Sequence, residues 1–259
     1  MAERLALNQD VAGSTPAPPA TPRYVGSLCS GIGGSDLGFA AAGWTIAWQV
    51  ERNDFRRAIL RDRFPDAVHG HQVEHTEWLK HQRHVDLLYA EPMSVEPPDV
   101  DPVLNAIDAL RPPRALVDVG PGHDPKRYEV VAQTLMRSGY DVVVNVFRYA
   151  MPGSEPRARA VFAAVKPPIP LPQMVLAIIH YYVGGATFET ANLIDEEALS
   201  VDDLERARGF PEGWTCLGHR DDRCTCPSAA RHKALRDAGS PLFGYLIASW
   251  LDGAVAESV

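Results

Sequence analysis

Residues 24–51 read YVGSLCSGIGGSDLGFAAAGWTIAWQVE. The apolar run at residues 24–29 is typical of a buried β-strand, and the glycines after it allow a sharp turn in which backbone amides can approach a ligand. A helical pattern then ends at Gly43, and a second strand at residues 46–50 leads directly to Glu51. We therefore predict a βαβ unit whose glycine turn and terminal acid are placed to bind a nucleotide-like ligand.

The composition is that of one main α/β domain. The chain has 259 residues, of which 46% are hydrophobic, and this is enough to bury one sizeable core. Its formal net charge of -8 gives no overall attraction to a nucleic-acid backbone, so any contact with DNA would be local and weak. No stretch approaches the roughly 20 apolar residues of a membrane span, and no secretory signal pattern is present. We expect a cytoplasmic protein that binds no membrane.

Downstream patterns extend the first unit into a doubly wound α/β domain. Apolar runs predict four more strands, at residues 85–90, 115–119, 140–148 and 161–165. Periodic apolar residues predict helices at residues 53–64, 103–110 and 128–138, and another after Ser200. We expect the arginines of the first of these helices to form a solvated face, and they are Arg56, Arg57, Arg61 and Arg63.

Two segments together resemble a known family. SLCSGIGGSDLGFAAAGW, from residue 27, and WQVERNDFRRAILRDRFPDA, from residue 48, are similar to the first two motifs of the DNA (cytosine-5)-methyltransferases. The resemblance implies the Rossmann-like fold of S-adenosylmethionine-dependent methyltransferases, and S-adenosylmethionine or S-adenosylhomocysteine as the cofactor. Glu51 would bind the ribose. The loop residues implied at the cofactor are Cys29, Gly31, Ile32, Gly33 and Gly34.

Later segments resemble the scaffold of the same family. LSVDDLERARGFPEGW, from residue 199, is similar to its ninth motif, and RHKALRDAGSPLFGYLIASW, from residue 231, is similar to its tenth. In the tenth motif the family has Gly-Asn at the cofactor, where this chain has Arg236 and Asp237. The Gly-Asp pair that contacts the adenine in the family reads Gly70-His71 here, so that contact is changed.

The reacting loops depart from the family. Met93 stands where the resemblance places the cysteine that attacks cytosine C6, and a thioether has no ionisable proton for that role. Ser94, beside it, would need an activating base. Val117 stands where the family has the glutamate that meets N3 of the base. Arg157 and Arg159 keep the place of two arginines that approach the base and its phosphate. We therefore predict that methyl transfer to cytosine C5 is absent.

Composition and the family resemblance together divide the chain into four predicted parts. By composition, residues 1–23 are expected to be a disordered tail. The resemblance implies that residues 24–165 are the cofactor-binding domain, that residues 166–235 form a reduced second lobe, and that residues 236–259 are a C-terminal helix that packs back on the first domain. Within that lobe, residues 174–193 contain no Arg or Lys, so they lack the donors on which base readout in the major groove depends.

Potential zinc ligands gather in a hydrophilic loop. Within CLGHRDDRCTC, residues 216–226, four side chains suit zinc, namely Cys216, His219, Cys224 and Cys226. The Cys-x-Cys spacing is tighter than in standard fingers, and His232 could serve as a substitute ligand. Reduced cysteines without a metal are the alternative.

Three functions stay open on the sequence alone. The first is a pseudoenzyme that binds the cofactor and works as a regulatory subunit of another chain, such as an active methyltransferase, in a DNA-modifying system. The second is an active transferase for a different nucleophile. The third is a zinc-stabilised binding or structural protein. Cofactor titration separates the third function from the others, and an assay on nucleic acid separates the second from the first.

Overall fold

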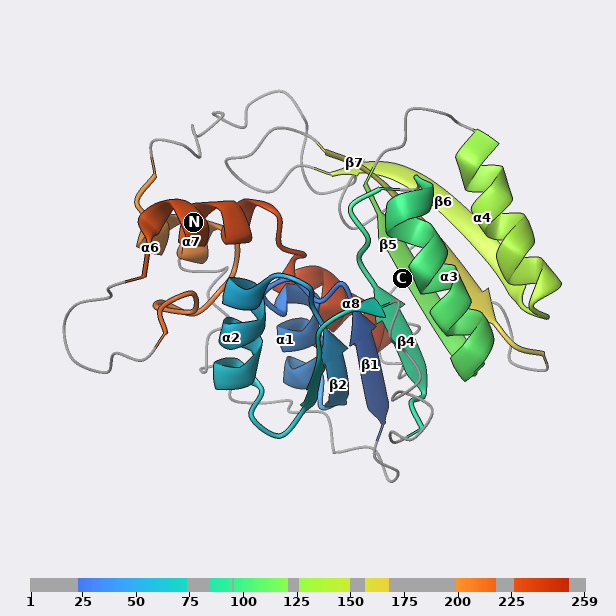
Figure 1. The fold of residues 1–259 in the computed structure, drawn as a ribbon, viewed down its shortest axis with the longest axis horizontal. Helices are drawn as coiled ribbons and strands as arrows, with labels where there is room; N and C mark the ends of the chain where they lie inside the picture. Colours follow the sequence, from blue (N-terminus) through green and yellow to red (C-terminus); the bar gives the residue numbers. More distant parts are fainter. Residues whose placement is uncertain are drawn as a thin grey trace.

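The computed structural model describes residues 23–73, 84–94, 96–120, 126–149, 157–167, 199–217 and 226–251. They form a seven-stranded sheet with helices on both faces (Figure 1). The strand order is β3-β2-β1-β4-β5-β7-β6. Within the ranges described, every helix is too short or too polar to span a lipid bilayer.

The sheet is parallel except at one strand. Its strands are β1 (Tyr24–Leu28), β2 (Thr45–Val50), β3 (Val68–Gly70), β4 (Leu87–Ala90), β5 (Arg114–Val119), β6 (Asp141–Tyr149) and β7 (Arg157–Val165). β7 runs antiparallel to both β5 and β6, and the other pairs are parallel. From β1 the chain first adds β2 and β3 on one side, and then returns to the centre to add β4 and β5 on the other side. The gap between β1 and β4 is therefore a topological switch point. Ligands of open α/β sheets bind at such a point, outside the carboxyl ends of the strands.

Helices cover the two faces of the sheet. They are α1 (Gly34–Ala41), α2 (Asp54–Arg63), α3 (Pro97–Leu110), α4 (Lys126–Arg137), α6 (Val201–Ala207), α7 (Ser228–Arg236) and α8 (Pro241–Leu251). α3 and α4 lie on one face, and α1 and α8 lie on the other (Figure 1). α3 begins earlier than predicted because Pro97 and Pro98 occupy its first turn, where a proline removes no helical hydrogen bond.

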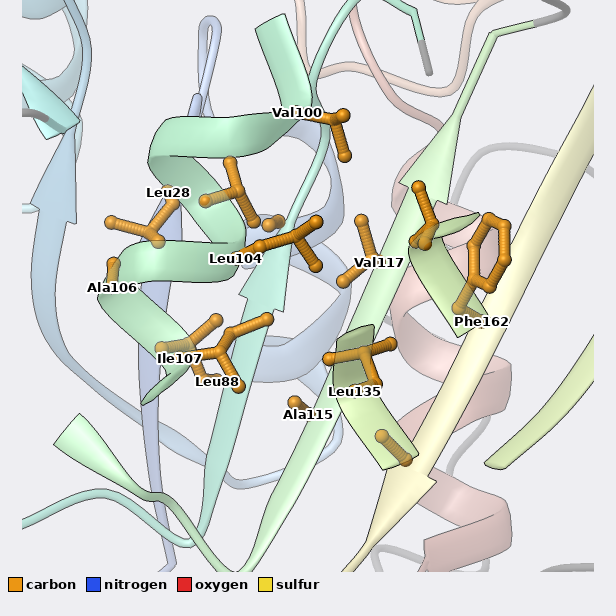
Figure 2. Close-up of a cluster of buried hydrophobic side chains, with 14 of the residues drawn as sticks. Leu28, Leu88, Val100, Leu104, Ala106, Ile107, Ala115, Val117, Leu135 and Phe162 are labelled. Atoms are coloured by element: carbon orange, nitrogen blue, oxygen red, sulfur yellow. The ribbon is translucent and has the colours of Figure 1, made fainter. Parts of the chain in front are cut away.

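The main core lies between the sheet and the pair α3 and α4. Leu28, Leu88 and Val117 from the strands contact Ile107 of α3 and Leu135 of α4 in one buried cluster (Figure 2). On the other face, a second cluster joins the strands to α1 and α8. Because both faces are buried, the central strands are continuous apolar runs, which is what the sequence patterns predict.

α1 and α8 cross at very close range. A Cβ at Gly38 would lie 2.0 Å from the carbonyl oxygen of Pro241, and a Cβ at Gly244 would lie 2.0 Å from the carbonyl oxygen of Ser35. Any side chain at either glycine would therefore force the two helices apart. The contact fixes α8 on the first helix of the chain.

A third apolar cluster joins α6 and α7 to the front of the domain. Ile32 and Ile59 contact apolar residues of both helices, and the indole N–H of Trp214 donates to the carbonyl oxygen of Ile32 at 2.9 Å. The described parts of the predicted second lobe, residues 199–217 and 226–235, therefore share a core with residues of the cofactor-binding domain.

Candidate functional site

A cavity of about 620 Å³ opens at the carboxyl ends of the strands, at the switch point between β1 and β4. Its lining comes from the ends of β1, β2, β4 and β5, the starts of α2 and α3, and the turn between α7 and α8. This volume lies within the range of roughly 300 to 1,000 Å³ of small-molecule sites.

The loop after β1 exposes its backbone to this cavity. Cys29 and Gly31 both have positive φ, 54° and 58°, a conformation that a non-glycine residue adopts only under strain. A Cβ at Gly31 would meet no atom within 4 Å, so the open side of this residue is free for a ligand. Both residues line the cavity.

The next three residues of the loop form a packed wall behind the cavity. Ile32 is fully buried in the third apolar cluster. A Cβ at Gly33 would lie 2.5 Å from the ring of Phe64, and a Cβ at Gly34 would lie 2.0 Å from the carbonyl oxygen of Gly239. Packing therefore requires glycine at positions 33 and 34. The lack of a side chain at Gly34 lets the turn before α8 lie against the start of α1.

Glu51, at the end of β2, is held by two backbone amides. It is 6% exposed; the N–H of Gly31 donates to one carboxylate oxygen at 2.9 Å, and the N–H of Asn53 donates to the other at 2.8 Å. A carboxylate has further lone pairs, which can accept hydrogen bonds from ligand hydroxyls. Glu51 is therefore a fixed acceptor that lines the cavity.

Three of the four arginines of α2 bind other groups of the protein. Arg57 is buried and donates to the carbonyl oxygen of Glu51 at 2.7 Å. Arg63 donates to the carbonyl oxygen of Trp214 at 2.9 Å, and Arg56 forms an ion pair with Asp237 at 2.5 Å. The prediction of a solvated face is therefore wrong for these three arginines. The end of α7 covers Arg56, the loop after α6 covers Arg63, and Arg57 turns back to the loop that joins β2 to α2.

The loop after β4 places Met93 at the cavity with its side chain 62% exposed. Its carbonyl oxygen lies against Gly120, where a Cβ would approach it to 2.5 Å. Ser94 donates from its hydroxyl to Asp99 of α3 at 2.9 Å, and Asp99 also lines the cavity. Sequence reasoning missed Asp99, and its position directly after the Pro97-Pro98 pair at a helix start was the available signal.

Val117 faces the core. It has no exposed surface, and it lies among side chains of α3 and α4 (Figure 2). The side chain of Asp118, the next residue, is buried elsewhere and accepts a hydrogen bond from the hydroxyl of Tyr89 at 3.3 Å. From the end of β5 it is Gly120 that lines the cavity. The position that the resemblance gives to the catalytic acid therefore lies inside the protein.

The remaining predicted residues fall in several places. Asp237 lines the cavity, and His71 lies near Asp54, with 3.9 Å between the ring nitrogen and the carboxylate. Arg157 and Arg159 lie on β7, paired with β6, and their side chains lie outside the described residues.

The predicted zinc set is only half described. The backbone N–H of Leu217 donates to the sulfur of Cys226 at 3.3 Å, and neither Cys216 nor Cys226 forms a disulfide bond with a described cysteine. His219 and Cys224 lie outside the described residues. In the part of the chain that the structure describes, no group of three or more candidate ligands could hold a metal ion, so the structure gives the zinc prediction no support.

Comparison with solved structures defines the class of fold. It is the Rossmann-like fold of S-adenosylmethionine-dependent methyltransferases. Similar structures include S. pombe Dnmt2 methyltransferase, with a TM-score of 0.68 and 13% identity over 90% of this chain and 99% of that one. An E. coli prophage-encoded DNA modification methyltransferase has a TM-score of 0.62 and 15% identity, over 91% and 100% of the two chains. A triple variant of Spodoptera frugiperda DNMT2 has a TM-score of 0.61 and 12% identity, over 91% and 100%. In sequence, no family model and no curated protein matches the chain.

Proposed function

We propose that this protein binds S-adenosylmethionine or S-adenosylhomocysteine at the switch point between β1 and β4, and that it is a relative of DNA cytosine methyltransferases that does not methylate cytosine C5. The observation that carries the binding proposal is Glu51, fixed between the amides of Gly31 and Asn53 at the wall of the cavity. A buried carboxylate at the end of the second strand is the acceptor that ribose hydroxyls require in this fold.

The other lining residues fit such a ligand. Gly31 leaves room for close approach of a ligand to the backbone, and Val50 and Val73 supply apolar contacts for a flat ring. When bound, S-adenosylmethionine would supply a methyl group for transfer. The protein's own residues would bind and orient it, with Glu51 fixing the ribose end.

The other half of the cavity supports the absence of C5 chemistry. The loop after β4 offers the Met93 thioether where a thiolate is needed. The charged side chains that the structure describes at this end of the cavity are the acids Glu91, on that loop, and Asp99, on α3. A flipped nucleotide carries a phosphate, which acids repel. Among the described residues that line this end of the cavity, none carries a thiol or a basic side chain, and the side chains of Arg157 and Arg159 lie outside the described residues.

The first prediction concerns cofactor binding. Glu51→Ala should weaken S-adenosylhomocysteine binding about 10- to 100-fold, because it removes the ribose acceptor and leaves two loop amides unpaired. Isothermal titration calorimetry measures the dissociation constant. Glu129→Ala, an exposed change on α4, is the matched control and should bind like the wild type. A wild-type protein that gives no heat and no thermal shift at millimolar ligand contradicts the proposal.

The second prediction concerns catalysis. The wild type should transfer no tritiated methyl group to C5 of cytosine in mixed-sequence DNA, and Met93→Cys alone should not restore transfer. The thiolate needs a partner at N3 of the base, and groups that act as one unit are not rescued singly. Protein-proportional, time-dependent incorporation by the wild type would contradict the proposal.

A second candidate function is methyl transfer to a different nucleophile. It is favoured by Asp99, which lies at the cavity, 2.9 Å from the hydroxyl of Ser94. This carboxylate could take up the proton that the nucleophile loses when it receives the methyl group. The tritium assay separates the two functions, because label in a product other than cytosine supports this one. A partnership with an active methyltransferase and a zinc ion near Cys216 both stay predictions.

A further inference from the structure

The turn between α7 and α8, residues 237–240, forms one wall of the cavity. Asp237 and Gly239 both line it. A Cβ at Gly239 would lie 2.2 Å from a carboxylate oxygen of Glu91, and the carbonyl oxygen of Gly239 lies against Gly34 at the start of α1. The turn is therefore in contact with the cofactor loop on one side and with the loop after β4 on the other.

One ion pair connects this turn to the opposite wall. The guanidinium of Arg56, on α2, lies 2.5 Å from the carboxylate of Asp237, and the ammonium of Lys233 lies 3.4 Å from the same oxygen. All three residues line the cavity. The side chains of Arg56 and Asp237 are 14% and 25% exposed, so the pair is only partly accessible to water and salt.

Asp237 stands at an unfavourable place for an acid. It is the C-terminal capping residue of α7, where the helix dipole is negative and basic side chains are favoured. Arg56 and Lys233 supply the positive charge that offsets this repulsion. Without Arg56, only the largely exposed Lys233 would offset the carboxylate, at a cavity that Glu51 and Glu91 also line.

Apolar contacts also join the two segments that carry this ion pair. The third apolar cluster, which includes Ile59 of α2 and Leu235 and Ala238 at the end of α7, holds the same two segments together. The ion pair lies beyond that cluster, at the cavity. Its removal should therefore leave the domain folded and release mainly the turn.

We propose that Arg56 and Asp237 are positioning residues that fix the α7–α8 turn as a wall of the cavity, and that the affinity for S-adenosylhomocysteine depends on their ion pair. This inference rests on the proposed cofactor function. The pair acts on the ligand through the turn, because an ordered wall is available before the ligand binds and does not have to be ordered during binding.

The test compares four proteins by calorimetry with S-adenosylhomocysteine: the wild type, Arg56→Asp, Asp237→Arg, and the double variant with the two charges exchanged. Each single variant brings like charges together and should bind about tenfold more weakly. The double variant should recover to within about threefold of the wild type, because the pair is restored in reverse. Arg61→Gln, an exposed change on the same helix, is the control and should bind normally.

A second measurement needs no ligand. Hydrogen exchange of the amides in residues 237–240 should be faster in Arg56→Asp than in the wild type and normal in the charge-exchanged variant, while the melting temperatures stay similar. Single variants that bind normally, or a turn whose exchange does not change, would overturn the inference while leaving the cofactor function intact. A wild type that does not bind the ligand would overturn both.

Discussion

Replacing Val117 by glutamate, the change that would restore the family's acid by sequence position, should lower the free energy of unfolding by about 4 kcal/mol at pH 7.5. Val117 has no exposed surface and lies in the main apolar cluster under α3 and α4. Carboxyl groups buried in such surroundings reach a pKa of roughly 8 to 9, so the folded protein keeps this glutamate protonated at pH 7.5. In the unfolded chain the carboxyl is ionised about three pH units above its ordinary pKa, and at about 1.4 kcal/mol per unit this favours unfolding by about 4 kcal/mol.

Urea denaturation followed by tryptophan fluorescence measures this change. Val68→Glu, on the exposed side of β3, places the same side chain in water and should change the free energy by no more than about 0.5 kcal/mol. An unfolding midpoint of Val117→Glu equal to that of the wild type would show that the introduced carboxyl reaches the cavity. If Val117→Glu destabilises the protein as expected, the double variant Met93→Cys, Val117→Glu will not gain methyl transfer to cytosine C5.

The second large effect is a dependence of stability on pH that arises from Asp36. Burial raises the pKa of Asp36 from 3.8 to about 6, and hydrogen bonds from Gln49 and Ser27 offset only part of that rise. The Gln49 amide nitrogen lies 2.6 Å from the carboxylate. Because the folded pKa is above the unfolded one, the contribution of Asp36 to stability is fully present below about pH 4. It is lost as the pH rises through 6, by about 3 kcal/mol in all.

Asp36→Asn removes this ionisation and keeps the shape of the side chain. The difference in unfolding free energy between Asp36→Asn and the wild type should therefore shift in favour of the variant as the pH rises from 4 to 7.5. Asp66→Asn removes an exposed acid near the end of α2 and serves as the control. A difference that is constant over this pH range would contradict the burial of a charged group at Asp36.

Much of the fold could be predicted from the sequence because its central strands are buried on both faces. Such strands are continuous apolar runs, so the predicted bounds of β5 are right to within one residue and those of β4 to within two. β3 was missed because Val68–Gly70 is three residues long and lies in a polar stretch with no alternation. The C-terminal helix was predicted to begin at residue 236, but α8 begins at Pro241, because residues 237–240 form the turn after α7.

The site was predictable in its local parts and not in its long-range ones. Glu51 and Gly31 follow from a spacing within one βαβ unit, so local pattern reasoning places them at a cavity. Arg56 meets Asp237 across the whole chain, and no local pattern on α2 identifies that partner. Val117 shows the opposite error, since a motif position gave it a role at the site while the alternation of β5 turns it toward the core.

The glycine crossing of α1 and α8 has a consequence for how the chain folds. The two helices meet although about two hundred residues separate them, and such distant contacts raise the contact order and slow folding. During synthesis, the apolar residues that β1 and α1 present to α8, such as Val25 and Phe39, stay uncovered until α8 has left the ribosome. The domain is therefore complete only after α8 has been translated, and until then the nascent chain exposes an apolar surface to which chaperones can bind.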